Sequence, residues 1–197
     1  MKKVFIIHGW GGSPDDTLLR WLKLELEKNG FEVIVPEMPN PEKPNIETWV
    51  LKLEEIIEVP DKDTILVGHS IGCQTILRYL EKLDPTSRVG GVVFIAPWFT
   101  LSNLENDEEW RVAGPWLDTP IRETDIIKHI PKITAIFSDN DPYVPSENIE
   151  MFKEKFSDYI KVIVEHKKGH FTVDDGVEKL ESALDAILKI NNYIWRN

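Results

Sequence analysis

The chain has 197 residues, of which 42% are hydrophobic and 29% charged, a composition that excludes a disordered chain and fits one folded domain over residues 1–197. Its formal net charge of −11 disfavours nucleic acid as a partner, because nucleic acid is itself a polyanion. The single cysteine, Cys73, cannot form an internal disulfide, so we expect a cytoplasmic protein.

The apolar run at the start of the chain is short. Residues 4–7 read VFII and are followed by His8-Gly9, so the run falls well below the roughly 7 to 15 apolar residues of a signal peptide. No stretch approaches the roughly 18 apolar residues that a membrane-spanning helix needs. We therefore expect no membrane partner.

Short runs rich in β-branched residues alternate with longer segments of helical period. The runs are hydrophobic on both faces, as buried parallel strands are, and they lie at residues 3–7, 31–35, 63–67, 91–95, 132–137 and 160–164. This alternation predicts an α/β fold with a doubly wound, mostly parallel six-stranded sheet and helices on both faces. The expected strand order is 2-1-3-4-5-6, with right-handed crossovers.

The segments between the strands carry helix start and stop signals. Ser13 is the expected cap of the first helix, and Asn29-Gly30 is expected to end it. Asn45 should begin the second helix, and the third should follow Ser70 directly. Later helices are expected at about 146–156 and 176–194.

Residues 97–131 form one long connection between the fourth and fifth strands. A connection of this length is typically functional or contains short helices of its own. It carries three of the seven tryptophans, Trp98, Trp110 and Trp116. Two interpretations stay open for them, since they either cover a sheet edge or, together with Phe171, wall a substrate pocket below an overhanging segment.

The third predicted strand ends in Gly68-His69-Ser70-Ile71-Gly72, directly before the third predicted helix. A serine in the pattern G-x-S-x-G fits a sharp strand-to-helix turn that projects its hydroxyl, and the glycines let neighbouring backbone approach. The pattern predicts a nucleophile at Ser70. Cys73, one helical turn further on, is expected to be a packed thiol.

A serine nucleophile needs a base, and the base needs an acid that holds its tautomer. Of the five histidines, His170 follows the sixth strand at the carboxyl end of the sheet and is the favoured base. His166 is its competitor but is expected to face solvent. The acid should follow the fifth strand, where Asp141 is favoured and Asp139 is expected to cap the turn.

An oxyanion hole needs backbone N–H donors aimed at the developing charge. The Ile71 amide, at the start of a helix, is the first expected donor. The second should come from the loop after the first strand, from Trp10 or, as the alternative, from Gly11. No metal and no organic cofactor is required by this chemistry.

Through His8-Gly9-Trp10-Gly11-Gly12, Gly68-His69-Ser70-Ile71-Gly72, Asp141-Pro142 and Gly169-His170-Phe171, the sequence resembles the α/β-hydrolase superfamily over essentially the whole chain. More narrowly, it is similar to the small serine hydrolases related to retinoblastoma-binding protein nine. The resemblance implies a Ser-Asp-His triad and a compact fold without a separate cap domain. The family takes its name from an interaction that depends on a Leu-x-Cys-x-Glu peptide. This sequence lacks that peptide, so we do not expect the same protein partner.

The sequence therefore predicts a serine hydrolase that cleaves a carboxylic ester, or alternatively an amide or thioester, of a small molecule. A non-catalytic binding protein on the same fold stays open, because fold and motif alone do not establish turnover. So does a lyase or an acyltransferase that uses the same triad.

Overall fold

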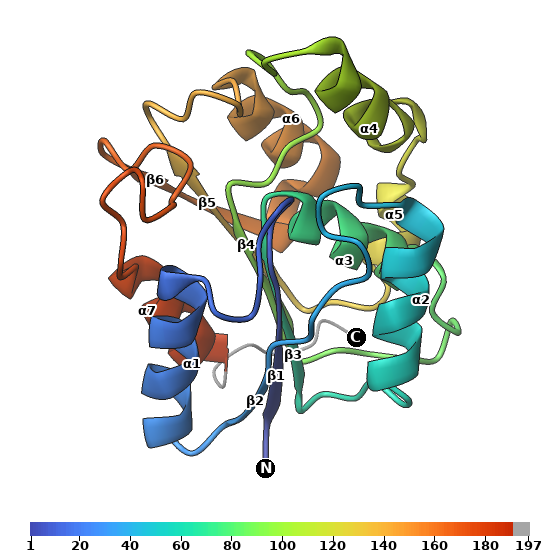
Figure 1. Ribbon diagram of the computed structural model, residues 1–197. Coiled ribbons are helices and arrows are strands. Elements are labelled where there is room, and N and C mark those ends of the chain that lie inside the picture. The colour runs from blue at the N-terminus through green and yellow to red at the C-terminus, as the bar shows by residue number, and fades with distance from the viewer. Residues whose placement is uncertain (191–197) are drawn as a thin grey trace.

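A six-stranded parallel sheet between two layers of helices forms the framework of the computed structural model, which describes residues 1–190 (Figure 1). The sheet order is β2-β1-β3-β4-β5-β6, and every neighbouring pair is parallel. The strands are β1 (Lys3–Ile7), β2 (Glu32–Ile34), β3 (Thr64–His69), β4 (Gly91–Ile95), β5 (Ile133–Ser138) and β6 (Ile160–Glu165). The six predicted strands, their order and the α/β class are confirmed.

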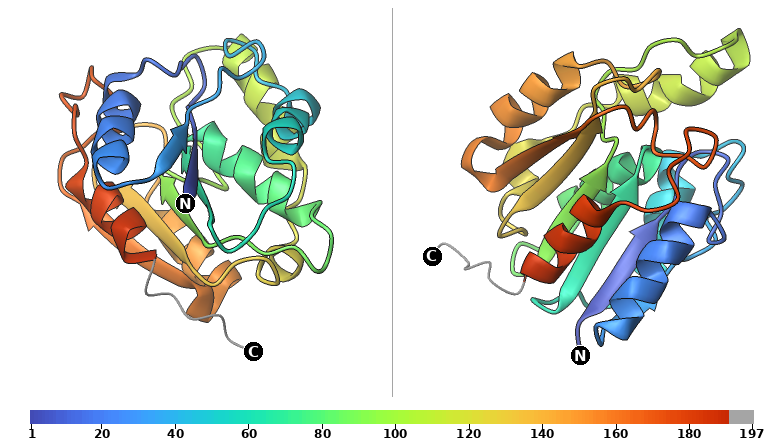
Figure 2. Two further views of the ribbon diagram at one scale, coloured as in Figure 1. Left: turned by 90° about the horizontal axis from the view of Figure 1, so that it is seen from below. Right: turned by 90° about the vertical axis from the view of Figure 1, so that its left-hand side faces the viewer.

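The helices cover both faces of the sheet, with α1 and α7 on one face and α2, α3 and α6 on the other (Figure 2). The α-helices are α1 (Thr17–Lys28), α2 (Ile46–Ile56), α3 (Ile71–Glu81), α4 (Asp107–Asp118), α5 (Glu123–Ile126), α6 (Glu147–Phe156) and α7 (Glu181–Lys189), and a 3-10 turn, η1 (Ser157–Tyr159), precedes β6. None of those helices is long and apolar enough to cross a membrane.

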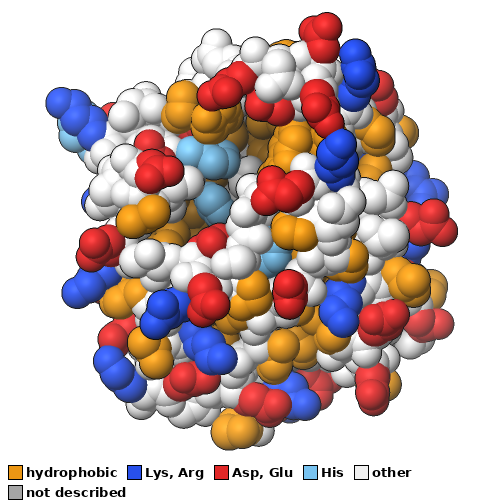
Figure 3. Space-filling view, in the orientation of Figure 1, with side chains coloured by type: hydrophobic (Ala, Val, Ile, Leu, Met, Phe, Trp, Pro, Cys, Tyr) orange, Lys and Arg blue, Asp and Glu red, His pale blue; other side chains and the backbone are white. Residues whose placement is uncertain are grey.

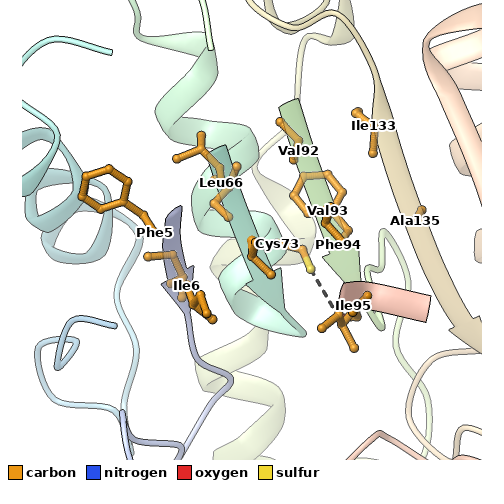
Figure 4. Close-up of a cluster of buried hydrophobic side chains, with 14 of the residues drawn as sticks. Phe5, Ile6, Leu66, Cys73, Val92, Val93, Phe94, Ile95, Ile133 and Ala135 are labelled. Carbon is orange, nitrogen blue, oxygen red and sulfur yellow. Dashed lines mark hydrogen bonds between the residues drawn. The ribbon is translucent and has the colours of Figure 1, made fainter. Parts of the chain in front are cut away.

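The central strands are buried on both faces, which is why they are apolar at every position. All five residues of β4 are buried, whereas the edge strand β6 is only partly covered. Figure 4 shows Cys73 of α3 beside Ile95 in this core, where Cys73 Sγ lies 3.4 Å from the Ile95 carbonyl oxygen and donates to it. Burial raises the pKa of the Cys73 thiol, so the expected packed thiol is confirmed.

The first helix begins later than the sequence signal suggests. It starts at Thr17 with Asp16 as its N-cap residue, so the prediction of a Ser13 cap is wrong. The Ser13 hydroxyl instead accepts the Asp15 N–H (3.1 Å), and the Asp16 carboxylate accepts the Ser13 N–H (3.1 Å). These local bonds close a turn before the helix and compete with the predicted capping geometry.

Of the other predicted helix starts, that of α2 agrees with the structure and that of α7 does not. Asn45 caps α2 as predicted, with its side chain accepting the Thr48 N–H. The last helix begins at Glu181 rather than near residue 176, because a turn that includes Gly176 at φ 75° precedes it. The predicted continuation over 191–194 lies outside the described residues.

The long connection 97–131 contains α4 and α5, and α4 lies above the carboxyl ends of the strands (Figure 1). Its first part is fixed by Asn148 of α6, which is fully buried. The Asn148 carboxamide accepts the N–H groups of Phe99 (2.6 Å) and Thr100 (3.0 Å). A buried polar group with all its bonds made is a strong anchor, so the connection is attached firmly beside the strand ends.

Gly72→Ala tests the contact between α3 and β1. A Cβ at Gly72 would overlap the Ile7 carbonyl oxygen and lie 2.9 Å from that of His8. Because backbone cannot move aside cheaply, we expect a loss of about 3 kcal/mol in the free energy of unfolding, measured with urea.

Gly114→Ala is the matched control in α4. Its nearest neighbour would be Asp118 Oδ2 at 4.0 Å, so the new methyl group meets open space. We expect a gain of up to about 1 kcal/mol, since alanine is the better helix former. Equal stability of the two variants would contradict a constraint at Gly72.

Candidate active site

Ser70 stands at the turn between β3 and α3 in a left-handed backbone conformation, with φ 51° and ψ −118°. Such a conformation is costly for a non-glycine residue and persists only where its surroundings impose it. Here a Cβ at Gly68 would lie 2.7 Å from the Cys73 nitrogen, and one at Gly72 would overlap Ile7. The two glycines therefore permit the tight packing that holds Ser70 in place.

The predicted nucleophile, base and acid form one chain of hydrogen bonds. Asp141 Oδ2 lies 2.8 Å from His170 Nδ1, and His170 Nε2 lies 2.9 Å from Ser70 Oγ. Because a carboxylate only accepts, Nδ1 carries the imidazole proton, and the unprotonated Nε2 accepts the serine hydroxyl. This tautomer leaves His170 ready to take the Ser70 proton.

The second carboxylate oxygen of Asp141 is also hydrogen-bonded, which holds the side chain in place. Oδ1 accepts the N–H groups of Tyr143 (2.9 Å) and Val144 (3.0 Å), and only 2% of the Asp141 side chain is exposed. Asp139 is placed differently, since its carboxylate binds His166 Nδ1 (2.5 Å) and the Lys167 N–H (2.8 Å) at the surface. Of the two aspartates, Asp141 is thus the one that contacts His170.

The remaining histidines bind backbone. His8 is buried, with Nδ1 donating to the Gly9 carbonyl (2.8 Å). His69 Nε2 lies 2.9 Å from the His170 carbonyl oxygen, and His129 Nδ1 lies 2.9 Å from that of Ser87. Burial lowers the pKa of His69 to about 4, with His170 as a smaller cause, so His69 is neutral near pH 7.

The two residues predicted to supply oxyanion donors lie in the loop after β1 and directly after the turn at Ser70. Ile71 is the first residue of α3, where an N–H has no acceptor within the helix. Trp10 lies in the loop after β1 and lines the same cleft as Ser70. The alternative donor, Gly11, already gives its N–H to the Pro41 carbonyl (2.9 Å), which favours Trp10.

A cleft of about 930 Å³ opens above Ser70 and His170. In Figure 3 it is the hollow in the upper part of the molecule, where histidine side chains lie beside hydrophobic ones and acidic side chains surround the rim. Trp98 and Phe171 line it, as predicted, together with Trp10. Further apolar walls are Leu18, Leu19, Leu101, Leu104, Val112 and Tyr143.

Trp110 and Trp116 do not line this cleft, contrary to the prediction. Trp110 is 41% exposed, whereas Trp116 is buried, and the centroid of its ring lies 6.2 Å from that of the Trp49 ring. Arg78 lies over the Trp116 ring and donates to the Trp116 and Thr119 carbonyls (2.8 and 2.9 Å) at the end of α4. Trp116 therefore belongs to the core, since helical spacing alone could not show which face of α4 packs inward.

Two kinds of residue at the site escaped the sequence-based reasoning. Seven Asp or Glu residues line the cleft, namely Asp15, Asp16, Glu42, Glu105, Glu108, Glu109 and Asp174. Asp175 binds the His170 backbone, with its Oδ2 2.8 Å from the His170 nitrogen. The carboxylates come from four separate segments, and no local pattern brings them together. Within residues 1–190, no group of three or more His, Cys, Asp or Glu residues is arranged to hold a metal ion.

The model of the serine hydrolase family matches residues 4–189. The chain belongs to the serine hydrolase family. It is 29% identical over 187 residues to the hydrolase YdeN of Bacillus subtilis (strain 168), covering 94% of each chain. It is 27% identical over 165 residues to the serine hydrolase RBBP9 of Rattus norvegicus, covering 83% of this chain and 78% of RBBP9. The predicted resemblance is confirmed.

Solved structures show the same α/β-hydrolase fold. The crystal structure of B. subtilis YdeN matches with a TM-score of 0.86 and 26% identity over 98% of this chain and all of that one. Est1E from Butyrivibrio proteoclasticus, solved with bound ferulic acid, matches with a TM-score of 0.75 and 14% identity over 98% of this chain and 90% of that one. At such identity the second match shows the fold alone.

His69→Gln tests the buried neutral histidine in this member of the family. In the unfolded chain His69 takes up a proton near pH 6.5, whereas in the folded protein it stays neutral down to about pH 4. The unfolded state therefore binds more protons as the pH falls, and the fold loses stability.

Between pH 7 and 4.5 we expect the parent to lose about 2 kcal/mol more stability than the variant, measured by urea unfolding at each pH. Parallel stability curves for the two proteins would contradict a buried neutral His69.

Proposed function

We propose that this serine hydrolase family member cleaves a carboxylic ester of a small molecule through an acyl-enzyme. The observation that carries the proposal is the continuous chain of hydrogen bonds from Asp141 through His170 to Ser70. This chain ends at the floor of a cleft with apolar walls. An amide or a thioester would follow the same course, and the low intrinsic barrier of ester cleavage makes the ester the first substrate to examine.

The first half-reaction transfers the acyl group to the enzyme. Ser70 Oγ attacks the carbonyl carbon while His170 Nε2 takes the hydroxyl proton, and Asp141 stabilises the resulting imidazolium. The Ile71 and Trp10 amides donate to the tetrahedral oxyanion. The bond between the carbonyl carbon and the alcohol oxygen then breaks, and the alcohol leaves with the proton from His170.

Water completes the cycle. His170 takes a proton from a water molecule, whose oxygen attacks the acyl carbon, and a second tetrahedral intermediate forms on the same donors. Its collapse breaks the bond to Ser70 Oγ, which regains its proton from His170. A carboxylic acid leaves the cleft, and the enzyme returns to its starting state.

The relatives support this choice of chemistry. RBBP9 is itself named a serine hydrolase, and the similarity to it extends over 83% of this chain. A structure described among carboxylesterases of Nitrososphaera gargenis shares the fold, with a TM-score of 0.72 at 15% identity. Esters are therefore the natural starting class.

Ser70→Ala tests the nucleophile. In a p-nitrophenyl ester series from acetate upward, we expect the variant to lose at least about 1,000-fold in kcat relative to the parent, because covalent catalysis is removed. Circular dichroism checks that both proteins are folded.

A fluorophosphonate probe serves as the second measurement, since it reacts with an activated serine whatever the natural substrate. The parent should be labelled at Ser70, and the variant should not. A folded parent that neither turns over any ester nor reacts with the probe would overturn the proposal in favour of a non-catalytic binding protein. Activity that yields no acid product would indicate a lyase or an acyltransferase.

The charge around the cleft narrows the substrate class further. Seven carboxylates line it, against one lysine, Lys43, and Lys43 is already paired with Glu108 at 2.6 Å. The described structure gives no hydrogen-bond partner to the side chains of Asp15, Glu42, Glu105 and Asp174. A cleft lined by one sign of charge raises the local concentration of the opposite charge, so substrates with a cationic group should be preferred.

Esters with acyl chains of equal length that end in a trimethylammonium or a carboxylate group test this preference. At low ionic strength we expect kcat/KM to be about tenfold higher for the cation, and the ratio should shrink in about 0.5 M salt as screening increases.

The double variant Glu105→Gln/Asp174→Asn should lower the ratio. The matched control is Glu154→Gln/Glu178→Gln, which changes the net charge equally at residues outside the cleft and should leave the ratio unchanged. Equal ratios in both variants would contradict a role for the rim carboxylates.

A further inference from the structure

The backbone around His170 has a conformation that is unfavourable for several of its residues. Lys167, Gly169 and Phe171 all have positive φ values, at 53°, 51° and 60°. For Lys167 and Phe171, which carry side chains, this conformation is disfavoured and persists only where surrounding contacts impose it. Contacts from outside these residues must therefore fix the path of the chain at His170.

Two side chains bind the backbone of His170 directly. Asp175 Oδ2 accepts the His170 N–H (2.8 Å), and His69 Nε2–H donates to the His170 carbonyl (2.9 Å). We propose that His69 and Asp175 are positioning residues, which hold both polar backbone groups of His170 so that its ring meets Ser70 and Asp141 together. This inference rests on the proposed function, in which His170 is the base.

His69 couples the nucleophile to the base because it directly precedes Ser70 in the chain. It lies at the end of β3 and is buried, with only 8% of its surface exposed. A carbonyl oxygen can only accept, so His69 Nε2 carries the proton. Because burial keeps His69 neutral, it donates this bond without placing a second positive charge beside the imidazolium that forms at His170. The ring centroids are 5.1 Å apart.

Asp175 is itself held in place. Its Oδ2 also accepts the Thr172 hydroxyl (2.8 Å) and the Thr172 N–H (3.2 Å). A Cβ at Gly169 would overlap the Asp175 carboxylate, so the glycine is needed for this approach. Asp175 does not line the cleft. Its loss should therefore change the rate of the reaction at Ser70 more than the binding of substrate.

The neighbouring pair of Asp139 and His166 offers a contrast. Asp139 binds the His166 ring and the Lys167 N–H, close to the same loop. Neither residue has a hydrogen bond to the His170 backbone among those of the described chain. His166→Leu thus removes a histidine bond near the loop and leaves both backbone bonds of His170 in place, which makes it the matched control.

The first experiment measures the rate constant of fluorophosphonate labelling. We expect His69→Leu to lower it at least about tenfold, since a displacement of roughly 1 Å in a catalytic group costs up to about 100-fold. His69→Gln keeps a side-chain N–H donor of similar reach and should recover most of the parental rate. His166→Leu should react like the parent.

The second experiment uses Asp175, which lies outside the buried core. With p-nitrophenyl acetate, Asp175→Ala should lower kcat at least about fivefold with KM close to the parental value, because the bond positions the base rather than the substrate. Asp175→Asn retains an oxygen acceptor and should recover most of kcat. Near-ultraviolet circular dichroism confirms that each variant has native packing.

The outcomes separate this inference from the proposed function. If the parent reacts with the probe and both His69→Leu and Asp175→Ala react at the parental rate, the positioning role is overturned while the hydrolase remains. Failure of His69→Gln and Asp175→Asn to recover activity would overturn it as well, because the hydrogen bonds would not be the cause. If the parent protein neither reacts with the probe nor hydrolyses the ester, the proposed function is overturned. The positioning role is then overturned as well, because it rests on that function.

Discussion

The close approach of the turn after β3 to strand β1 is the constraint on which the site depends. It requires a residue without a side chain at Gly72, where a Cβ would meet the backbone of Ile7 and His8. The turn itself requires one at Gly68, where a Cβ would meet the backbone of Gly72 and Cys73. With the chain this tightly packed, Ser70 is forced to φ 51°, and its hydroxyl faces His170 rather than the sheet. The burial of α3, whose residues from Ile71 to Leu80 are all covered, offsets the strain at that one residue.

The parallel sheet converts this local constraint into a shared site. All six strands run in the same direction, so the loops that follow them meet at one edge of the sheet. The residues of the site follow four different strands: Trp10 follows β1, Ser70 follows β3, Asp141 follows β5 and His170 follows β6. They are distant in sequence, yet the same buried sheet positions all of them. Asn148 attaches the long connection beside them through the Phe99 and Thr100 amides, which gives the cleft a fixed wall.

The cleft combines two electrostatic environments. At its floor the groups are buried and fully hydrogen-bonded, as Asp141 shows with its two backbone donors and its bond to His170. Around its rim the carboxylates are mostly exposed. Buried bonds of this kind are little affected by salt, whereas exposed charges act over longer distances and are screened. The rim can thus attract or repel substrates without disturbing the geometry at the floor.

The sequence by itself determined the six strands, their order and the serine turn, because β-branched runs and glycines at fixed offsets are local signals. It also placed Ser70, Asp141 and His170 at the ends of the right strands. Only the tertiary structure decided that Trp116 packs in the core and that Asp175 binds the His170 backbone. Those outcomes, like the later start of the first helix beyond Ser13, depend on which of several available partners a side chain meets, and that choice is made by packing between segments distant in the chain.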